Sequence, residues 1–124
     1  MTETLNDYSW LADDMREFIR MTEESYPTDA ADFSVAEQRV FYDRMCRAFD
    51  RPYPAGVRAE DRAIAGVPCR IYAPERARPG VTVVYFHGGG FVVGGLDSHD
   101  AICAELSAGA QVRLIAVDYR SSPE

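Results

Sequence analysis

The fold is decided by one stretch of sequence, Val81-Thr82-Val83-Val84-Tyr85-Phe86-His87-Gly88-Gly89-Gly90. Residues 81–86 are β-branched or aromatic throughout, and an almost wholly apolar strand is typical of a sheet that is covered on both faces. Three glycines directly after the strand let the backbone turn sharply and point its amides outward. Amides held in this way can receive the negative charge that develops when a carbonyl becomes tetrahedral. The stretch therefore predicts a buried strand followed by an oxyanion-hole loop.

Two other interpretations of the glycine loop stay open. Glycine loops also cradle phosphates, but G-x-G-x-x-G is not matched, because Val93 stands where the third glycine would be, and G-x-x-x-x-G-K-S/T is absent. The loop could also be a purely structural turn. The oxyanion hole is favoured, because His-Gly-Gly-Gly after the third strand is the pattern of that loop in lipases and esterases.

The sequence around this stretch predicts an α/β fold. Runs of alternating or wholly apolar residues indicate strands. A polar N-terminal turn followed by apolar residues at helical spacing indicates a helix, and Gly109 is expected to end it. The helix start offers Asp97 or Ser98 as the N-cap. The order strand, strand, strand, helix, strand predicts a mixed sheet of about four strands with one right-handed crossover helix. The expected elements beyond residues 81–86 are strands at Val57–Ile64, Val67–Tyr72 and Val112–Asp118 and a helix at Ser98–Ala108.

Two amphipathic helices precede the strands. Apolar residues at helical spacing between Tyr8 and Ile19 predict the first. Ser34 and Glu37 form a capping-box pattern that begins the second, and Pro52 ends it. These helices indicate a cap-like region, although plain core helices are an equally good interpretation. We therefore divide the chain into a helical cap-like region, residues 1–54, and the N-terminal part of an α/β core, residues 55–124.

Composition excludes several classes of function. The formal charge is −7 and the pI about 4.8, which argues against binding to nucleic acid or to anionic lipid. No run approaches the roughly 18 apolar residues of a membrane span, and the polar N-terminus is no signal peptide. Cys46, Cys69 and Cys103 are odd in number and lack metal-ligand spacing. They predict reduced thiols in a cytoplasmic protein without a metal or another cofactor.

Several motifs together resemble the bacterial hormone-sensitive-lipase family of α/β-hydrolases. They are Tyr85-Phe86-His87-Gly88-Gly89-Gly90-Phe91-Val92-Val93-Gly94, then Ser98-His99-Asp100, then Val117-Asp118-Tyr119-Arg120 through Pro123-Glu124. One departure is Ser121-Ser122, where the family usually has Leu-Ala. The resemblance covers roughly residues 57–124, and the N-terminal helices resemble the family's cap region more loosely.

The resemblance implies roles for the residues of the loop. The amides of Gly89 and Gly90 would donate to the oxyanion while Gly88 shapes the turn, and a further amide would follow the nucleophile. His87 would be structural and would fix the loop through its ring nitrogens. The implied activity is serine-dependent hydrolysis of short-chain carboxylic esters, with a small-molecule ester as the substrate.

The nucleophile, the acid and the base of such an enzyme are missing from these 124 residues. No serine stands in G-x-S-x-G, and Ser107 comes closest but falls inside the helix expected at 98–108. Ser98, His99 and Asp100 are not expected to form a relay, because sequence neighbours at a helix start do not point at one another. We expect them to cap the helix instead.

A sheet with one crossover helix would leave one face nearly bare and would end on an apolar edge. The chain stops six residues after Asp118, and complete α/β-hydrolases occupy roughly 200–250 residues or more. We therefore expect the N-terminal part of an esterase that is inactive alone. The alternative is a non-catalytic half-fold that acts as an interaction module. In either case the open sheet edge could support self-association.

Overall fold

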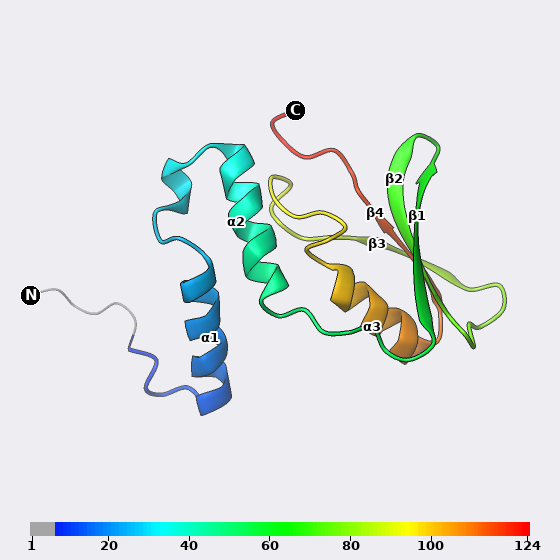
Figure 1. The fold of residues 1–124 in the computed structure, drawn as a ribbon, viewed down its shortest axis with the longest axis horizontal. Helices are drawn as coiled ribbons and strands as arrows, with labels where there is room; N and C mark the ends of the chain where they lie inside the picture. Colours follow the sequence, from blue (N-terminus) through cyan, green and yellow to red (C-terminus); the bar gives the residue numbers. More distant parts are fainter. Residues whose placement is uncertain (1–6) are drawn as a thin grey trace, which may run out of the picture.

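The computed structural model describes residues 7–124 and contains one mixed sheet and three α-helices (Figure 1). The first six residues, which belong to the polar N-terminus that argues against a signal peptide, lie outside the described residues. The elements in chain order are α1 (Asp13–Ser25), a short 3-10 helix η1 (Ala30–Asp32), α2 (Val35–Arg47), β1 (Val57–Ile64), β2 (Val67–Pro74), β3 (Thr82–Phe86), α3 (Asp100–Ala110) and β4 (Arg113–Val117).

The four strands form a single sheet in the order β1-β2-β4-β3. β1 and β2 are a hairpin, β2 and β4 are antiparallel, and β3 and β4 are parallel. In the register of the sheet, Ile115 of β4 lies between Ile71 of β2 and Val84 of β3. Parallel neighbours need a crossover connection, and α3 supplies it. The predicted mixed four-stranded sheet with one crossover helix is confirmed.

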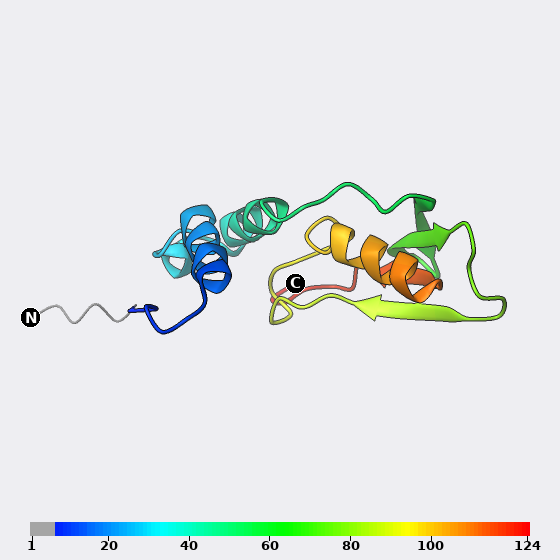
Figure 2. The ribbon, with the colours of Figure 1, turned by 90° about the horizontal axis from the view of Figure 1, so that it is seen from below.

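The core lies between the sheet and α3. Tyr72 of β2 and Leu114 of β4 are fully buried against Cys103 and Ala104 of the helix. Leu114 and Ala116 alternate with Ile115 and Val117, so that one face of β4 meets α3. Figure 2 shows α3 lying along the sheet on one side. This packing fixes the carboxyl ends of β3 and β4 next to each other.

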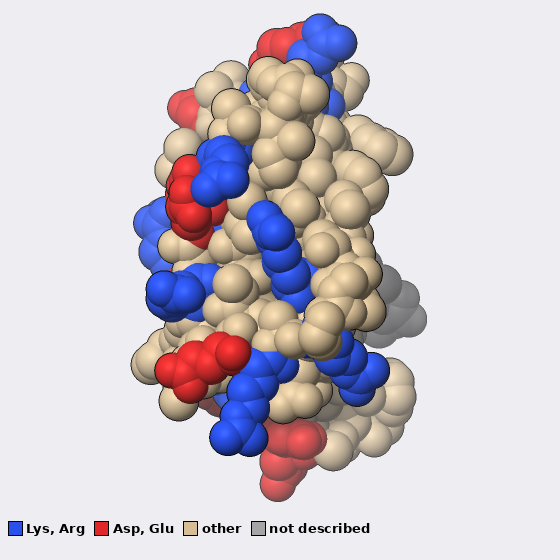
Figure 3. Space-filling model, turned by 90° about the vertical axis from the view of Figure 1, so that its right-hand side faces the viewer, with Lys and Arg blue, Asp and Glu red and all other residues tan. Residues whose placement is uncertain are grey.

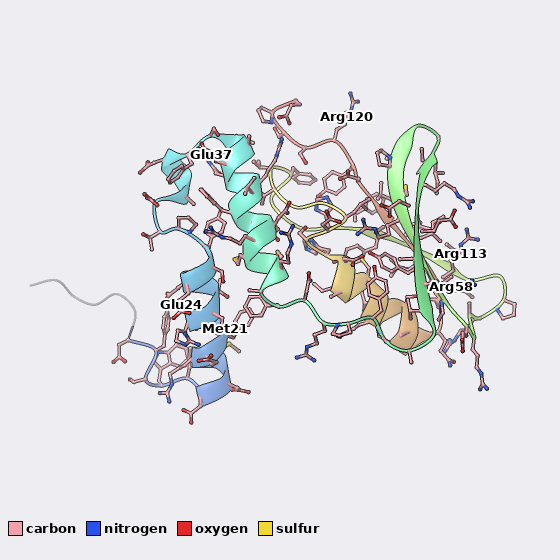
Figure 4. All side chains as sticks on the ribbon, viewed as in Figure 1. Met21, Glu24, Glu37, Arg58, Arg113 and Arg120 are labelled. Atoms are coloured by element: carbon pink, nitrogen blue, oxygen red, sulfur yellow. The ribbon has the colours of Figure 1, made fainter. Side chains whose placement is uncertain are left out.

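The rest of the sheet is open. β3 is an edge strand whose apolar side chains remain accessible, with Val84 53% and Phe86 64% exposed. The opposite edge, β1, is exposed along almost its whole length. Figure 3 views the molecule from the side of the β1–β2 hairpin and shows a broad uncharged surface crossed by basic side chains. Figure 4 places Arg58 and Arg113 on this side. Hence β3, expected to be covered on both faces, is an accessible edge in the described chain.

α1 and α2 lie beside the sheet as a pair, next to the glycine loop and away from the β1–β2 hairpin (Figure 1). The predicted capping box is present: the Ser34 hydroxyl accepts from the Glu37 amide, and the Glu37 carboxylate accepts from the Ser34 amide. Figure 4 labels Glu37 at this end of α2. The first helix begins at Asp13, so Tyr8 and Leu11 precede it instead of belonging to it. Phe18 packs against Phe49 with ring centroids 5.0 Å apart.

The ends of α3 differ from the prediction. Its N-cap is His99 and no side chain caps it, so the expected capping by Asp97 or Ser98 is wrong. Gly109 lies inside the helix, and the left-handed C-cap is Gln111, at φ 54°. Two hydrogen bonds close the last turn of the helix beyond Gly109. The Gln111 amide donates to the Ala108 carbonyl, and the Val112 amide donates to the Ser107 carbonyl. No helix within residues 7–124 is long and apolar enough to cross a membrane.

Candidate active site

The glycine loop leaves the sheet at the carboxyl end of β3 and folds back on itself. The Gly89 carbonyl accepts from the amides of Val92 and Val93, each at 3.1 Å. Gly89 has φ +126° and Gly90 φ +60°, a region that side chains disfavour. A Cβ on Gly89 would lie 2.0 Å from the Val93 carbonyl oxygen. Only glycine therefore fits at position 89.

The amides of this loop are free to bind a ligand. Within residues 7–124, the amides of Gly88, Gly89 and Gly90 donate to no acceptor of the protein. Gly88 and Gly90 are exposed and Gly89 is half-buried, so water or a substrate can reach them. Amide groups fixed by a tight turn and left without acceptors are suited to receive a negatively charged oxygen. The structure thus brings together the three glycines that the sequence singles out.

His87 is packed beneath the loop and is almost fully buried. Its ring stacks on Tyr119, with centroids 4.3 Å apart and planes 11° apart. His87 Nδ1 lies 2.7 Å from the Gly88 carbonyl oxygen, and the Tyr119 hydroxyl donates to the His87 carbonyl at 2.6 Å. His87 Nε2 is buried and has no partner in the described chain. Of the two ring nitrogens of His87, Nδ1 is therefore the one that contacts the loop in the described chain.

Gly94 is a further requirement of this loop that sequence reasoning did not single out. It has φ +90°, and a Cβ there would lie 2.7 Å from both the Gly88 carbonyl oxygen and His87 Nδ1. The sequence did contain a hint of this role, because Gly94 is the last residue of the glycine-rich stretch 85–94 that carries the family resemblance. Tyr119, from the segment after β4, was missed in the same way. Tyr119 shapes the loop from a position that only the folded chain brings close, whereas Gly94 is the loop's neighbour in sequence.

Ser98 and His99 do contact each other, contrary to the prediction for sequence neighbours. Ser98 Oγ lies 2.9 Å from His99 Nδ1 and also bonds to the backbone of Gly95. Burial, followed by the nearby charge of His87, lowers the pKa of His99 below its usual range. The Asp100 carboxylate, however, is bound elsewhere, so the three side chains form no relay.

Asp100 instead anchors the start of α3 to the sheet. Its carboxylate accepts hydrogen bonds from the hydroxyls of Tyr72, at 2.6 Å, and Tyr53, at 2.8 Å. It also pairs with Arg70 at 3.0 Å, and Arg70 pairs in turn with Asp61 and Asp97. Burial, followed by the hydrogen bond to Asp100, raises the pKa of Tyr53 to about 12 and that of Tyr72 further. The network holds β1, β2 and α3 together below the glycine loop.

An apolar pocket of about 280 Å³ lies between α1, α2 and the start of α3. Ser98 and His99 line it on the side of the sheet, and the ring of His99 lies 5.5 Å from that of His87. No group of three or more side chains within residues 7–124 is arranged to hold a metal ion. The apolar lining comprises Phe18, Tyr42, Met45, Cys46, Phe49, Ala101 and Ile102.

Several known proteins that are similar to this chain in sequence are hydrolases. The model of a family described as having the alpha/beta hydrolase fold matches residues 83–124. An ethyl acetate hydrolase of Pseudomonas putida is 48% identical over 61 residues, which cover 47% of this chain and 19% of that protein. The carboxylesterase NlhH of Mycobacterium tuberculosis is 40% identical over 74 residues, 55% of this chain and 23% of that protein.

The three-dimensional similarity extends over most of the chain. An esterase of the bacterial hormone-sensitive lipase family superposes on 91% of this chain, with a TM-score of 0.77 and 24% identity. The match covers 37% of that esterase. Among the curated relatives, the matched region spans from 19% to 29% of the relative's length. Both the sequence and the fold therefore match one portion of larger hydrolases.

Proposed function

Because the chain belongs to the hormone-sensitive-lipase family of α/β-hydrolases, of which it spans the N-terminal portion, we propose that it supplies the oxyanion hole of a serine carboxylesterase. The substrates would be short-chain carboxylic esters. The amides of Gly89 and Gly90 would bind the oxyanion, Gly88 would shape the turn, and His87 would support the loop from below.

One observation carries this proposal: the loop holds three amides without acceptors in a conformation that only glycine permits at position 89. Donors that are fixed before the reaction need no reorganisation as charge develops on the substrate oxygen. A purely structural turn has no need for three accessible and unused donors. Phosphate-binding glycine loops lead directly into the N-terminus of a helix, whereas α3 begins only at Asp100, ten residues after Gly90.

The chemistry follows from the serine-hydrolase template. A serine oxygen attacks the ester carbonyl carbon as its proton passes to the base, and the carbonyl oxygen takes up the negative charge that the loop amides stabilise. When the tetrahedral intermediate collapses, the C–O bond to the alcohol breaks and the alcohol leaves with a proton from the base. Water then attacks the acyl-serine by the same route and releases the acid. The apolar pocket beside His99 would receive an apolar group of the ester.

We propose that residues 1–124 alone do not turn over esters, because they contain no G-x-S-x-G serine. Loss of the catalytic triad costs on the order of 10⁶ in turnover in a serine hydrolase. Adding p-nitrophenyl butyrate to the purified chain should therefore release p-nitrophenol at the rate of the buffer. A rate near that of a complete esterase, abolished by replacing a serine of this chain, would overturn this part of the proposal.

A chimera tests the oxyanion hole directly. Residues 1–124 are fused to the remaining C-terminal sequence of the Pseudomonas putida ethyl acetate hydrolase, which would supply the nucleophile, acid and base. We expect hydrolysis of short p-nitrophenyl esters. Gly89→Ala should lower kcat about 10²–10³-fold, because the loop must move its donors to relieve the contact with Val93. Gly109→Ala is the matched control, since a Cβ there meets nothing and the site is helical.

A second candidate function rests on the open edge of β3. Val83, Val84 and Phe86 are accessible on an edge strand, which can pair with another chain. A non-catalytic module would self-associate through this edge. Sedimentation of the 124-residue chain and its Val84→Arg variant tests this, and concentration-dependent dimers lost in the variant would favour it. An inactive unsubstituted chimera together with such dimers would replace the esterase proposal.

A further inference from the structure

The glycine loop is bound at its far end by a side chain from α2. Arg39 Nε donates to the Val92 carbonyl oxygen at 2.8 Å, and Arg39 Nη2 donates to the Ser122 carbonyl oxygen at 3.1 Å. Nη1 and Nη2 also pair with the Glu124 carboxylate, at 3.0 and 2.7 Å. One guanidinium therefore joins three segments that lie far apart in the sequence.

The contact acts on the turn that orients the free amides. The Val92 amide donates to the Gly89 carbonyl, so holding Val92 holds the peptide unit between Gly89 and Gly90. The Ser122 amide donates to the Phe91 carbonyl at 2.6 Å, so the C-terminal segment supports the loop beside Arg39. Tyr119 bonds the His87 carbonyl at the start of the loop. The loop is thus fixed at both ends, by Tyr119 at one and by Arg39 at the other.

The chemistry of arginine suits this position. Its planar guanidinium presents several donors in a fixed fork, whereas lysine offers a single compact charge. Hydrogen bonds from a charged donor are about twice as strong as those between neutral groups. The Arg39 side chain is 30% exposed, so water screens it only in part. Arg39 bonds to two backbone carbonyls and one carboxylate at the same time, which engages more of its donors than a single acceptor could.

We propose that Arg39 is a positioning residue for the oxyanion loop, which couples the helical region at α2 to the orientation of the Gly89 and Gly90 amides. The proposal rests on the proposed function of the loop. Arg39 touches no reacting atom. It acts through the Val92 carbonyl and keeps the turn closed around the Gly89 carbonyl.

The test follows the loop itself and uses no substrate. Amide hydrogen exchange is measured in the 124-residue chain for Val92 and Val93, whose amides donate to Gly89, with the amides of β4 as the internal reference. The variants are Arg39→Ala and Arg39→Lys. Arg44→Ala is the matched control, because Arg44 lies on the same helix but reaches the Ser25 carbonyl of α1 instead of the loop.

We expect Arg39→Ala to speed exchange at Val92 and Val93 by at least about tenfold more than at β4. Arg39→Lys should give an intermediate effect, and Arg44→Ala should match the unmodified chain. Equal acceleration at the loop and at β4, or the same loop-specific effect in Arg44→Ala, would overturn the proposal. If Arg39→Ala does not fold, Arg39→Lys decides the question, because it keeps the charge and the aliphatic stem.

The two proposals fail in different ways. An inactive chimera contradicts the esterase function but leaves the exchange result intact. In an active chimera, Arg39→Lys should lower kcat at least about tenfold with little change in KM, because the donors bind the transition state more than the substrate. A rise in KM with an unchanged kcat would mean that Arg39 serves only substrate binding, and it would overturn the positioning role.

Discussion

The sheet with α3 and the pair α1 and α2 are stabilised in different ways. The first has a closed core in which Tyr72 and Leu114 are inaccessible to water. In the second, no residue of either helix is buried. α1 and α2 instead depend on a capping box, on aromatic contacts at the surface and on the reach of Arg39 to the glycine loop.

The difference between these two regions predicts which mutations affect the stability of the fold and which affect only the helices. Burial of apolar area fixes the strands, because it scales with the area removed from water. No residue of the two helices is fully buried, so their placement rests on partly exposed aromatic contacts and on hydrogen bonds that are individually worth about 1 kcal/mol. A helical region held in this way can shift without unfolding the sheet. Mutations should therefore have unequal effects in the two regions.

The largest effect is expected in the core. Leu114→Ala should lower the free energy of unfolding by about 2–5 kcal/mol, because the cavity it leaves is enclosed by α3 and β2. The matched change in the helical region is Val40→Ala on α2, where the side chain is 64% exposed. That change should stay within about 0.5 kcal/mol. Urea denaturation followed by circular dichroism gives both values, and equal losses would contradict the contrast.

An intermediate effect is expected at the Asp100 network, and it depends on pH. Tyr72 has its pKa raised above the usual 10.0 by burial and by the bond to Asp100. The folded state therefore favours the protonated hydroxyl, whose stabilisation is present below pH 10 and is lost as the pH rises further. Denaturation at pH 8 and pH 11 should show a fall in stability that is smaller in Tyr72→Phe. If stability falls equally in both proteins, titratable groups other than Tyr72 cause the loss.

The smallest effect is expected at the capping box. Ser34→Ala removes the hydroxyl that accepts a hydrogen bond from the Glu37 amide. It should lower the free energy of unfolding of α2 by about 1 kcal/mol. Thr28→Ala, in the exposed turn before α2, is the control and should be neutral. The loss should appear as reduced protection of α2 amides, with those of β4 unchanged. A loss spread evenly over β4 would mean that the two regions unfold together.

Much of the α/β half follows from the sequence alone. The apolar strand and the glycine loop lie next to each other in the chain, so local pattern predicts both. The capping box is equally local, because Ser34 and Glu37 are three residues apart. The bounds of α3 were less predictable, because a non-glycine residue, Gln111, takes the left-handed cap while Gly109 stays inside the helix.

The supports of the candidate site could not be predicted. Arg39 lies 53 residues from its partner Val92, and nothing in the pattern of α2 marks it for the loop. Tyr119 contacts His87 across 32 residues. The contact between Ser98 and His99 depends on side-chain rotamers at an uncapped helix start, which sequence spacing does not specify. Such contacts are decided by the tertiary arrangement and not by local periodicity.

The reach of Arg39 also limits how relatives of this chain can be recombined. A crossover between α2 and β1 looks harmless, because it cuts an exposed connection outside every element. It would nevertheless pair a foreign helix with the native Val92 carbonyl and the native Ser122 segment. The helical region and the glycine loop are thus joined by a contact that crosses this connection. The acceptors Val92 and Ser122 offer backbone carbonyls that any parent would supply, so a recombined chain should keep this contact wherever the helix it receives carries an arginine at position 39.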